Sequence, residues 1–304
     1  MTQTGPTPAE LDRHFGISGR AHVGADSAGN AAVRITTEKC TGAICLHGAH
    51  VTSWKPAGQE EVIFLSSKAT FAEGKAIRGG TPICFPWFRA KSDDAKAPAH
   101  GFARTKLWTL ESMQEQTGDI SVTVSTESDD ATRQWWPHEF RAQLIATFGD
   151  ALQLEFTVSN TGATAFRYEE ALHTYYRVGN TSQARLAGLG GVTFFDNTDG
   201  NRARAQSGDV AIAKATDRAY INTEHALELI DSGLRRRIHI VKKNSASTVV
   251  WNPWSEAASK MSDMGEGEWR SMFCAEACNI LTNAVRLAPG EAHTIGVTTT
   301  VGGL

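Results

Sequence analysis

The chain has 304 residues, of which 41% are hydrophobic and 21% are charged, a balance typical of globular domains. Its net charge of −3 argues against general binding to nucleic acid or to anionic membranes, since both need an excess of lysine and arginine. No apolar run approaches the roughly 20 residues that a membrane-spanning helix needs.

The N-terminal stretch predicts a short helical extension over residues 1–16. Thr7 can cap a helix, Pro8 suits its first position and Glu10 completes a capping box. Gly16 is expected to end this helix. Because no basic segment followed by an apolar core occurs here, we expect no secretory signal.

Five cysteines are scattered along the chain, at positions 40, 45, 84, 274 and 278. An odd number at irregular spacing, without an export signal, predicts reduced thiols and a cytoplasmic location. Cys274 and Cys278 would share a helical face, but their segment is better explained as a strand, so we predict no metal site there.

Beyond residue 16 the pattern is that of short strands. Apolar runs, several of them alternating with polar residues, occur at 31–35, 44–46, 62–65, 120–124, 142–148, 152–158, 210–212, 238–240, 249–251 and 295–297. One short helix is expected within 255–264. Many short strands and almost no long helical pattern predict an all-β sandwich or barrel. No linker or repeat divides residues 1–304, so we expect one domain.

Residues 169–179 predict a strand with an unusual polar face. Alternation places Leu172, Tyr176 and Val178 on one face and Glu169, His173, Tyr175 and Arg177 on the other. A histidine, an acid, a phenol and a guanidinium on one rigid element are typical of a binding or catalytic surface. The same pattern is also compatible with a solvent-exposed face.

Three stretches depart from the simple strand pattern. Residues 76–90 contain two glycines, two prolines and three aromatic residues, which predicts a loop held by aromatic packing with Arg78 at its mouth. Residues 100–104 follow a polar loop. Residues 272–279 place Glu276 inside an otherwise uncharged strand, where a carboxylate is costly to bury unless it is paired or functional.

His173 and Glu276 are therefore candidates for an acid–base pair, in which the carboxylate would help to keep the imidazole protonated. Glu276 as a structural hydrogen-bonding group is the alternative. His47 and His50 lack the helical setting of zinc motifs. Two of Glu169, Glu170 and Glu276 could instead supply glycosidase carboxylates. Aromatic surfaces that suit sugar rings, although each also fits a core position, are Trp54, Trp87, Tyr175, Trp251 and Trp254.

Several motifs together resemble the D-hexose-6-phosphate mutarotases, or glucose-6-phosphate 1-epimerases, of the aldose 1-epimerase superfamily. Residues 77–88 (IRGGTPICFPWF) followed by 100–104 (HGFAR) resemble the family's arginine-containing segments. Residues 172–176 (LHTYY) look like its catalytic histidine strand, and 274–277 (CAEA) like its catalytic glutamate segment. Residues 216–220 (TDRAY) and 251–254 (WNPW) also match, and all of these motifs follow the family's order.

The resemblance implies a large antiparallel β-sandwich of the galactose-mutarotase type with a few short helices. It implies His173 and Glu276 as catalytic residues and Asp217 as a substrate-binding residue, with no metal or organic cofactor. Arg78 and Arg104 are expected to bind a phosphate, because guanidinium offers paired donors to a dianion. His100 is expected to orient the substrate or to share the acid role. One position departs from the pattern, because some members have glutamine where this chain has Ala99.

The expected activity is that of an isomerase, interconverting α and β anomers of hexose 6-phosphates, in a protein that is expected to be monomeric. An epimerase of uncharged aldoses and a non-catalytic carbohydrate-binding module are the alternatives. The charged loop over residues 89–96 has no predicted role.

Overall fold

The computed structural model describes residues 5–304. Helix α1 (Pro8–Phe15) is capped by Thr7, whose side chain and that of Glu10 form the predicted capping box. The helix ends at Gly16, as expected. Residues 1–4 of the predicted extension lie outside the described residues.

A nine-stranded antiparallel sheet forms one layer of the molecule. Its strands, in spatial order, are β16 (Val210–Ala211), β13 (Ala184–Ala187), β18 (Leu227–Asp231), β19 (Arg236–Lys243), β23 (Ala292–Gly303), β9 (Leu152–Asn160), β8 (Phe140–Phe148), β7 (Asp119–Glu127) and β6 (Thr109–Gln116). The central strands alternate buried and half-buried residues, as in β8, because only one face of this sheet packs on the core.

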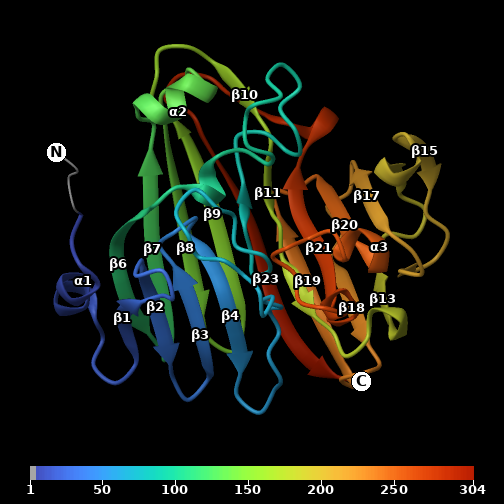
Figure 1. Ribbon diagram of the computed structural model, residues 1–304, viewed down its shortest axis with the longest axis horizontal. Coiled ribbons are helices and arrows are strands. Elements are labelled where there is room, and N and C mark those ends of the chain that lie inside the picture. The colour runs from blue at the N-terminus through green and yellow to red at the C-terminus, as the bar shows by residue number, and fades with distance from the viewer. Residues whose placement is uncertain (1–4) are drawn as a thin grey trace.

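Two further sheets lie side by side over this layer (Figure 1). The four-stranded sheet contains β1 (Ala21–Ala25), β2 (Ala31–Thr36), β3 (Cys40–Cys45) and β4 (His50–Pro56). The eight-stranded sheet has the order β15 (Arg202–Ala205), β14 (Thr193–Asp196), β17 (Thr216–Ile221), β20 (Ser247–Asn252), β21 (Met272–Asn279), β11 (Glu170–Leu172) and β5 (Ile83–Cys84), and β12 (Tyr175–Arg177) also pairs with β21.

Smaller elements complete the described part of the chain. Strands β10 (Phe166–Tyr168) and β22 (Val285–Leu287) form a two-stranded sheet, and the remaining α-helices are α2 (Asp130–Trp135) and α3 (Trp254–Ala258). Short 3-10 helices lie at Ala103–Thr105, Thr181–Gln183, Asn197–Asp199, Glu268–Ser271 and Leu281–Asn283. The predicted all-β class with few short helices is confirmed.

The core lies between the layers. Buried aromatic residues fill it, and Trp54 of β4 donates from its indole to the carbonyl of Gly149 at the end of β8. Tyr176 of β12 reaches Thr299 of β23 across the sandwich. All five cysteines are buried free thiols. Among residues 5–304, no helix has the length and hydrophobicity needed to cross a bilayer.

Three predicted elements differ from the structure. The strand expected over 169–179 is interrupted at His173 and Thr174, because the His173 amide donates to the carbonyl of Pro82 and leaves the regular ladder. Residues 62–65 form only isolated bridges, not a strand. The helix expected over 255–264 is shorter, since amides from Lys260 onward bond three residues back and tighten the chain into turns.

Candidate active site

One row of functional side chains lies on the face of the eight-stranded sheet that turns away from the main core. The strand register pairs Asp217 with Trp251, Trp251 with Cys274, and Cys274 with Tyr175. Residues paired in this way lie beside each other on the same face of a sheet. This row therefore runs across four strands, with a carboxylate at one end and a phenol at the other.

His173 and Glu276 lie in the neighbouring row. Strands β11 and β12 both pair with β21 in a single register, Leu172 opposite Ala277 and Tyr175 opposite Cys274. His173, which lies between these two strands, is consequently opposite Glu276. Its Nε2 atom is 3.2 Å from Oε1 of Glu276, so the structure brings together two residues about a hundred positions apart.

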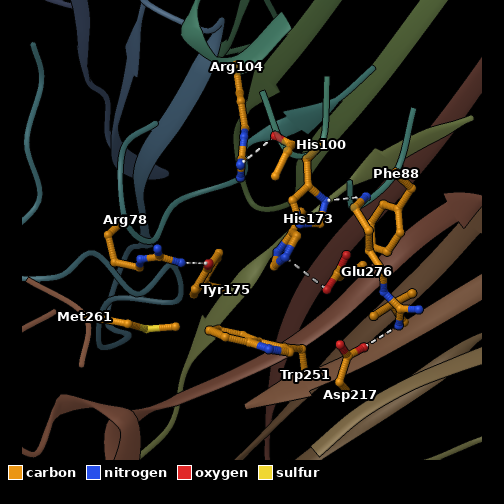
Figure 2. Close-up of a pocket in the computed structure, with 13 residues that line it drawn as sticks. Arg78, Phe88, His100, Arg104, His173, Tyr175, Asp217, Trp251, Met261 and Glu276 are labelled. Carbon is orange, nitrogen blue, oxygen red and sulfur yellow. Dashed lines mark hydrogen bonds and ion pairs between the residues drawn. The ribbon is translucent and has the colours of Figure 1, made fainter. Parts of the chain in front are cut away.

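A cavity of about 280 Å³ lies over these rows. All six predicted site residues line it: Arg78, His100, Arg104, His173, Asp217 and Glu276. The rest of its lining consists of Phe88, Arg89, Ala99, Tyr175, Val249, Trp251 and Met261. Figure 2 shows Arg78 and Tyr175 at one side and Asp217 at the other, with His173 and Glu276 between them.

Glu276 is fully buried, and its surroundings in the described part of the chain leave its carboxyl group unpaired. Neither carboxyl oxygen makes a hydrogen bond within residues 5–304, since the close approach of His173 does not have hydrogen-bond geometry. Burial raises the pKa of Glu276 well above its ordinary value of 4.5, and the negative charge of Asp217 raises it further. The positive charges of Arg89 and Arg104 oppose this rise.

The histidine of the pair has the opposite shift. Burial, followed by the positive charge of Arg104, lowers the pKa of His173 to about 3. The expectation that a carboxylate would keep this imidazole protonated is therefore wrong for the free protein. Burial therefore favours a state in which the pair of His173 and Glu276 shares one proton, held by Glu276, and neither group is charged.

His100 is held in one tautomer. The backbone amide of Arg89 donates to its Nδ1 atom over 3.3 Å, and the Cys84 thiol lies 3.5 Å from the same nitrogen. Burial, followed by the charge of Arg104, lowers the pKa of His100 to about 2. The ring is therefore neutral with its proton on Nε2, and it can only donate from that atom.

Two arginines approach the cavity from the loops before and after β5. Arg78 donates to the Tyr175 hydroxyl over 3.0 Å and forms an ion pair with Asp263 at 3.2 Å. Arg104 donates to the Ala99 carbonyl over 2.9 Å, while its Nε atom is buried without a partner within residues 5–304. An unsatisfied buried guanidinium nitrogen is costly to leave without an acceptor, which favours an anionic ligand.

Asp217 is held by two partners. Nη2 of Arg89 donates to its Oδ1 atom over 2.6 Å, and Nδ2 of Asn197 donates to Oδ2 over 2.7 Å. Arg89 was not predicted as a site residue. The only signal in the sequence was the charge of the loop over residues 89–96, which Arg89 opens.

Several sequence-based expectations do not hold. Glu169 accepts hydrogen bonds from the amides of Phe88 and Leu281, and Glu170 contacts Asn279 and His293, so neither glutamate lines the cavity as a glycosidase carboxylate would.

Of the aromatic residues considered for sugar binding, only Tyr175 and Trp251 line the cavity. Trp54 and Trp87 pack in the main core, and Trp254 packs against Trp269. His47 and His50 bind separate backbone carbonyls, those of Lys75 and Gly79.

Comparison with known proteins agrees with this arrangement. The family model described as aldose 1-epimerase matches residues 31–300. This chain belongs to the aldose 1-epimerase family.

The relatives of this family member include proteins from bacteria and a plant. A protein of Salmonella typhimurium described as "Putative glucose-6-phosphate 1-epimerase" is 35% identical over 233 residues, which cover 76% of this chain and 77% of the relative. A protein of Cenchrus ciliaris with the same description is 32% identical over 263 residues, covering 83% and 78%.

The crystal structure described as that of a "putative mutarotase (YeaD)" from Salmonella typhimurium matches with a TM-score of 0.89 and 28% identity. The match covers 95% of this chain and 96% of that chain. The predicted sandwich of the galactose-mutarotase type is thereby confirmed.

Proposed function

We propose that the protein interconverts the α and β anomers of a hexose 6-phosphate. The observation that supports this is the contact between His173 and Glu276 on the cavity floor, with arginines nearby that can bind an anion. An acid and a base in contact suit mutarotation, because the hydroxyl oxygen on C1 and the ring oxygen are bonded to the same carbon. The groups that exchange protons with these two oxygens must therefore be neighbours.

Ring opening transfers two protons and breaks one bond. Glu276 removes the proton from the C1 hydroxyl, His173 donates a proton to the ring oxygen, and the bond between C1 and that oxygen breaks. The product is an aldehyde with a free hydroxyl on C5. Rotation about the bond between C1 and C2 exposes the other face, and the reverse transfers close the ring. General acid–base assistance of this kind contributes about 10²- to 10⁴-fold per group.

The protonation states that burial favours in the free protein are those of the ring-open stage of this reaction. After ring opening Glu276 holds a proton and His173 is neutral, which is the arrangement that burial favours in the empty cavity. Before opening, the same two groups form an ion pair in surroundings that disfavour charge. Discharging this pair during ring opening lowers the energy of the intermediate relative to the closed sugar.

The arginines would determine the preference for a phosphorylated sugar. Within residues 5–304, the buried Nε atom of Arg104 has no acceptor, and Arg78 is held by Tyr175. A phosphate between these two arginines would supply acceptors to both. Trp251, which lies edge-on to His173 and Tyr175, would cover one face of the sugar ring.

Exchange between anomers, measured by NMR on the purified protein, tests the proposal. We expect faster exchange with glucose 6-phosphate than with free glucose, above the uncatalysed rate. Comparable acceleration of both sugars would instead indicate an epimerase of uncharged aldoses. No acceleration of any sugar, together with saturable binding, would indicate a carbohydrate-binding module.

A further inference from the structure

We infer that Arg89 is a specificity-determining residue that, together with Asp217, binds the hydroxyl on C2 of the substrate. The inference rests on the proposed function and deepens it, because it defines which hexose phosphates the cavity accepts. Three features of the site support it: the backbone conformation of Arg89, the hydrogen-bond donors of the Arg89 side chain, and the order of groups along the cavity.

The backbone of Arg89 adopts a left-handed conformation, with φ of 62°. Residues other than glycine occupy this region at a cost of about 1–2 kcal/mol. Two hydrogen bonds with His100 hold the conformation, one from the Arg89 amide to the imidazole and one from the His100 amide to the Arg89 carbonyl over 2.7 Å. The fold therefore aims a side chain into the cavity from a position that glycine would occupy with less strain.

The Arg89 guanidinium can donate more hydrogen bonds than the one that it makes to Asp217. Its Nη2 atom is bonded to Asp217, and its central carbon lies 5.7 Å from the centre of the Phe88 ring. Within residues 5–304, its Nη1 and Nε atoms make no hydrogen bond, and about a quarter of the side chain is exposed, 27%. A hydroxyl both donates and accepts, so it is matched by a guanidinium and a carboxylate that lie side by side.

The order of groups along the cavity identifies this hydroxyl. Arg78 and Tyr175 lie at one side, His173 and Glu276 in the middle, and Asp217 at the other side (Figure 2). In a hexose 6-phosphate, the chain of atoms from the phosphate runs through C6, C5, the ring oxygen, C1 and C2.

With the phosphate at Arg78, the ring oxygen at His173 and the C1 hydroxyl at Glu276, the next substituent is the C2 hydroxyl. Its position along this order is that of the ion pair between Arg89 and Asp217.

The test compares glucose 6-phosphate with 2-deoxyglucose 6-phosphate, which lacks only this hydroxyl. The wild-type protein should prefer glucose 6-phosphate by roughly 10- to 100-fold in kcat/KM, the effect of one hydrogen bond to a charged partner. In Arg89→Gly this ratio should fall to within about threefold. Both substrates use the same acid and base, so the ratio cancels any effect of the substitution on Glu276.

Arg235→Gly is a matched control, because Arg235 also has a left-handed backbone, with φ of 53°, and is exposed outside the cavity. It should retain the wild-type ratio. If Arg89→Gly does not fold, Arg89→Met keeps the backbone and stem of the arginine and should also lose the preference.

A wild-type protein that turns over both sugar phosphates equally would overturn the inference, as would an Arg89 variant that keeps the wild-type ratio. In both cases the proposed function would stand. Absence of any exchange with glucose 6-phosphate would instead reject the proposed function itself.

Discussion

Replacing Glu276 with glutamine should abolish most activity and yet leave the fold at least as stable. Because Glu276 is the proposed base, the substitution should lower kcat by about 10²- to 10⁴-fold, equivalent to about 3–5 kcal/mol of activation free energy. The fold should tolerate the change, because the side chain is fully buried and no hydrogen bond to it exists within residues 5–304. Anomer exchange by NMR and urea denaturation on the same preparation measure both effects.

The stabilities of wild type and Glu276→Gln should also depend differently on pH. The pKa of Glu276 is raised in the folded protein above its ordinary value of 4.5, so the native state holds more protons than the unfolded state above that pH. The contribution of Glu276 to wild-type stability therefore falls as pH rises through this window, by up to about 1.4 kcal/mol per pH unit. Glu276→Gln lacks this loss, so its stability relative to wild type should increase as pH rises above about 5.

Glu170→Gln is the matched control. Glu170 is also fully buried, but it accepts a hydrogen bond from Asn279 over 2.8 Å and pairs with His293 at 3.2 Å. This variant should keep its activity and lose about 1–3 kcal/mol of stability, because the pair with His293 is weakened. Equal pH slopes for wild type and Glu276→Gln would refute the raised pKa, and more than a tenth of wild-type activity in Glu276→Gln would refute its role as the base.

Four further variants test other parts of the site. Arg78→Ala and Arg104→Ala should each lower the kcat/KM ratio of glucose 6-phosphate over glucose by about 10- to 100-fold, since each removes charge-assisted bonds to phosphate; an unchanged ratio would reject the phosphate assignment. Gly101→Ala should lower stability by more than about 2 kcal/mol, seen as a lower melting temperature, because its Cβ would lie 1.9 Å from the Phe85 carbonyl oxygen at φ of 74°. Trp251→Ala should raise KM for both sugars by about fivefold or more, because the sugar ring loses its contact with the indole. Unchanged KM values would mean that the sugar does not bind against Trp251.

The sequence was most informative where a residue contradicted its surroundings. Glu276 could be singled out because a carboxylate within an uncharged strand must be paired or functional, and the structure places it on the cavity floor. The alternating strands of the nine-stranded sheet were also predictable, since one buried face imposes a period of two. Both features depend on interactions that act within a few residues.

Features that depend on pairing between distant segments could not be derived from local patterns. His173 and Glu276 were candidates for a pair, but their contact results from the shared register of two short strands on β21, which no local pattern encodes. The interruption at His173 depends on the carbonyl of Pro82, and the position of Arg89 depends on its bonds with His100. The sequence shows only a charged loop at that point.

The pH profile of the reaction should depend on whether the sugar bears a phosphate. The positive charges of Arg104 and Arg78 lower the pKa of His173, after the larger effect of burial. A bound phosphate adds negative charge beside these arginines, so it should raise the pKa at which the pair of His173 and Glu276 loses its shared proton. Activity needs that proton, and kcat reports the protonation of the bound complex.

The alkaline limb of kcat should therefore lie at higher pH for glucose 6-phosphate than for glucose. In Arg104→Ala, one of these positive charges is gone, so the alkaline limb should move to higher pH for both sugars. Coincident alkaline limbs in the wild-type protein would mean that the phosphate binds too far from His173 and Glu276 to act on their shared proton.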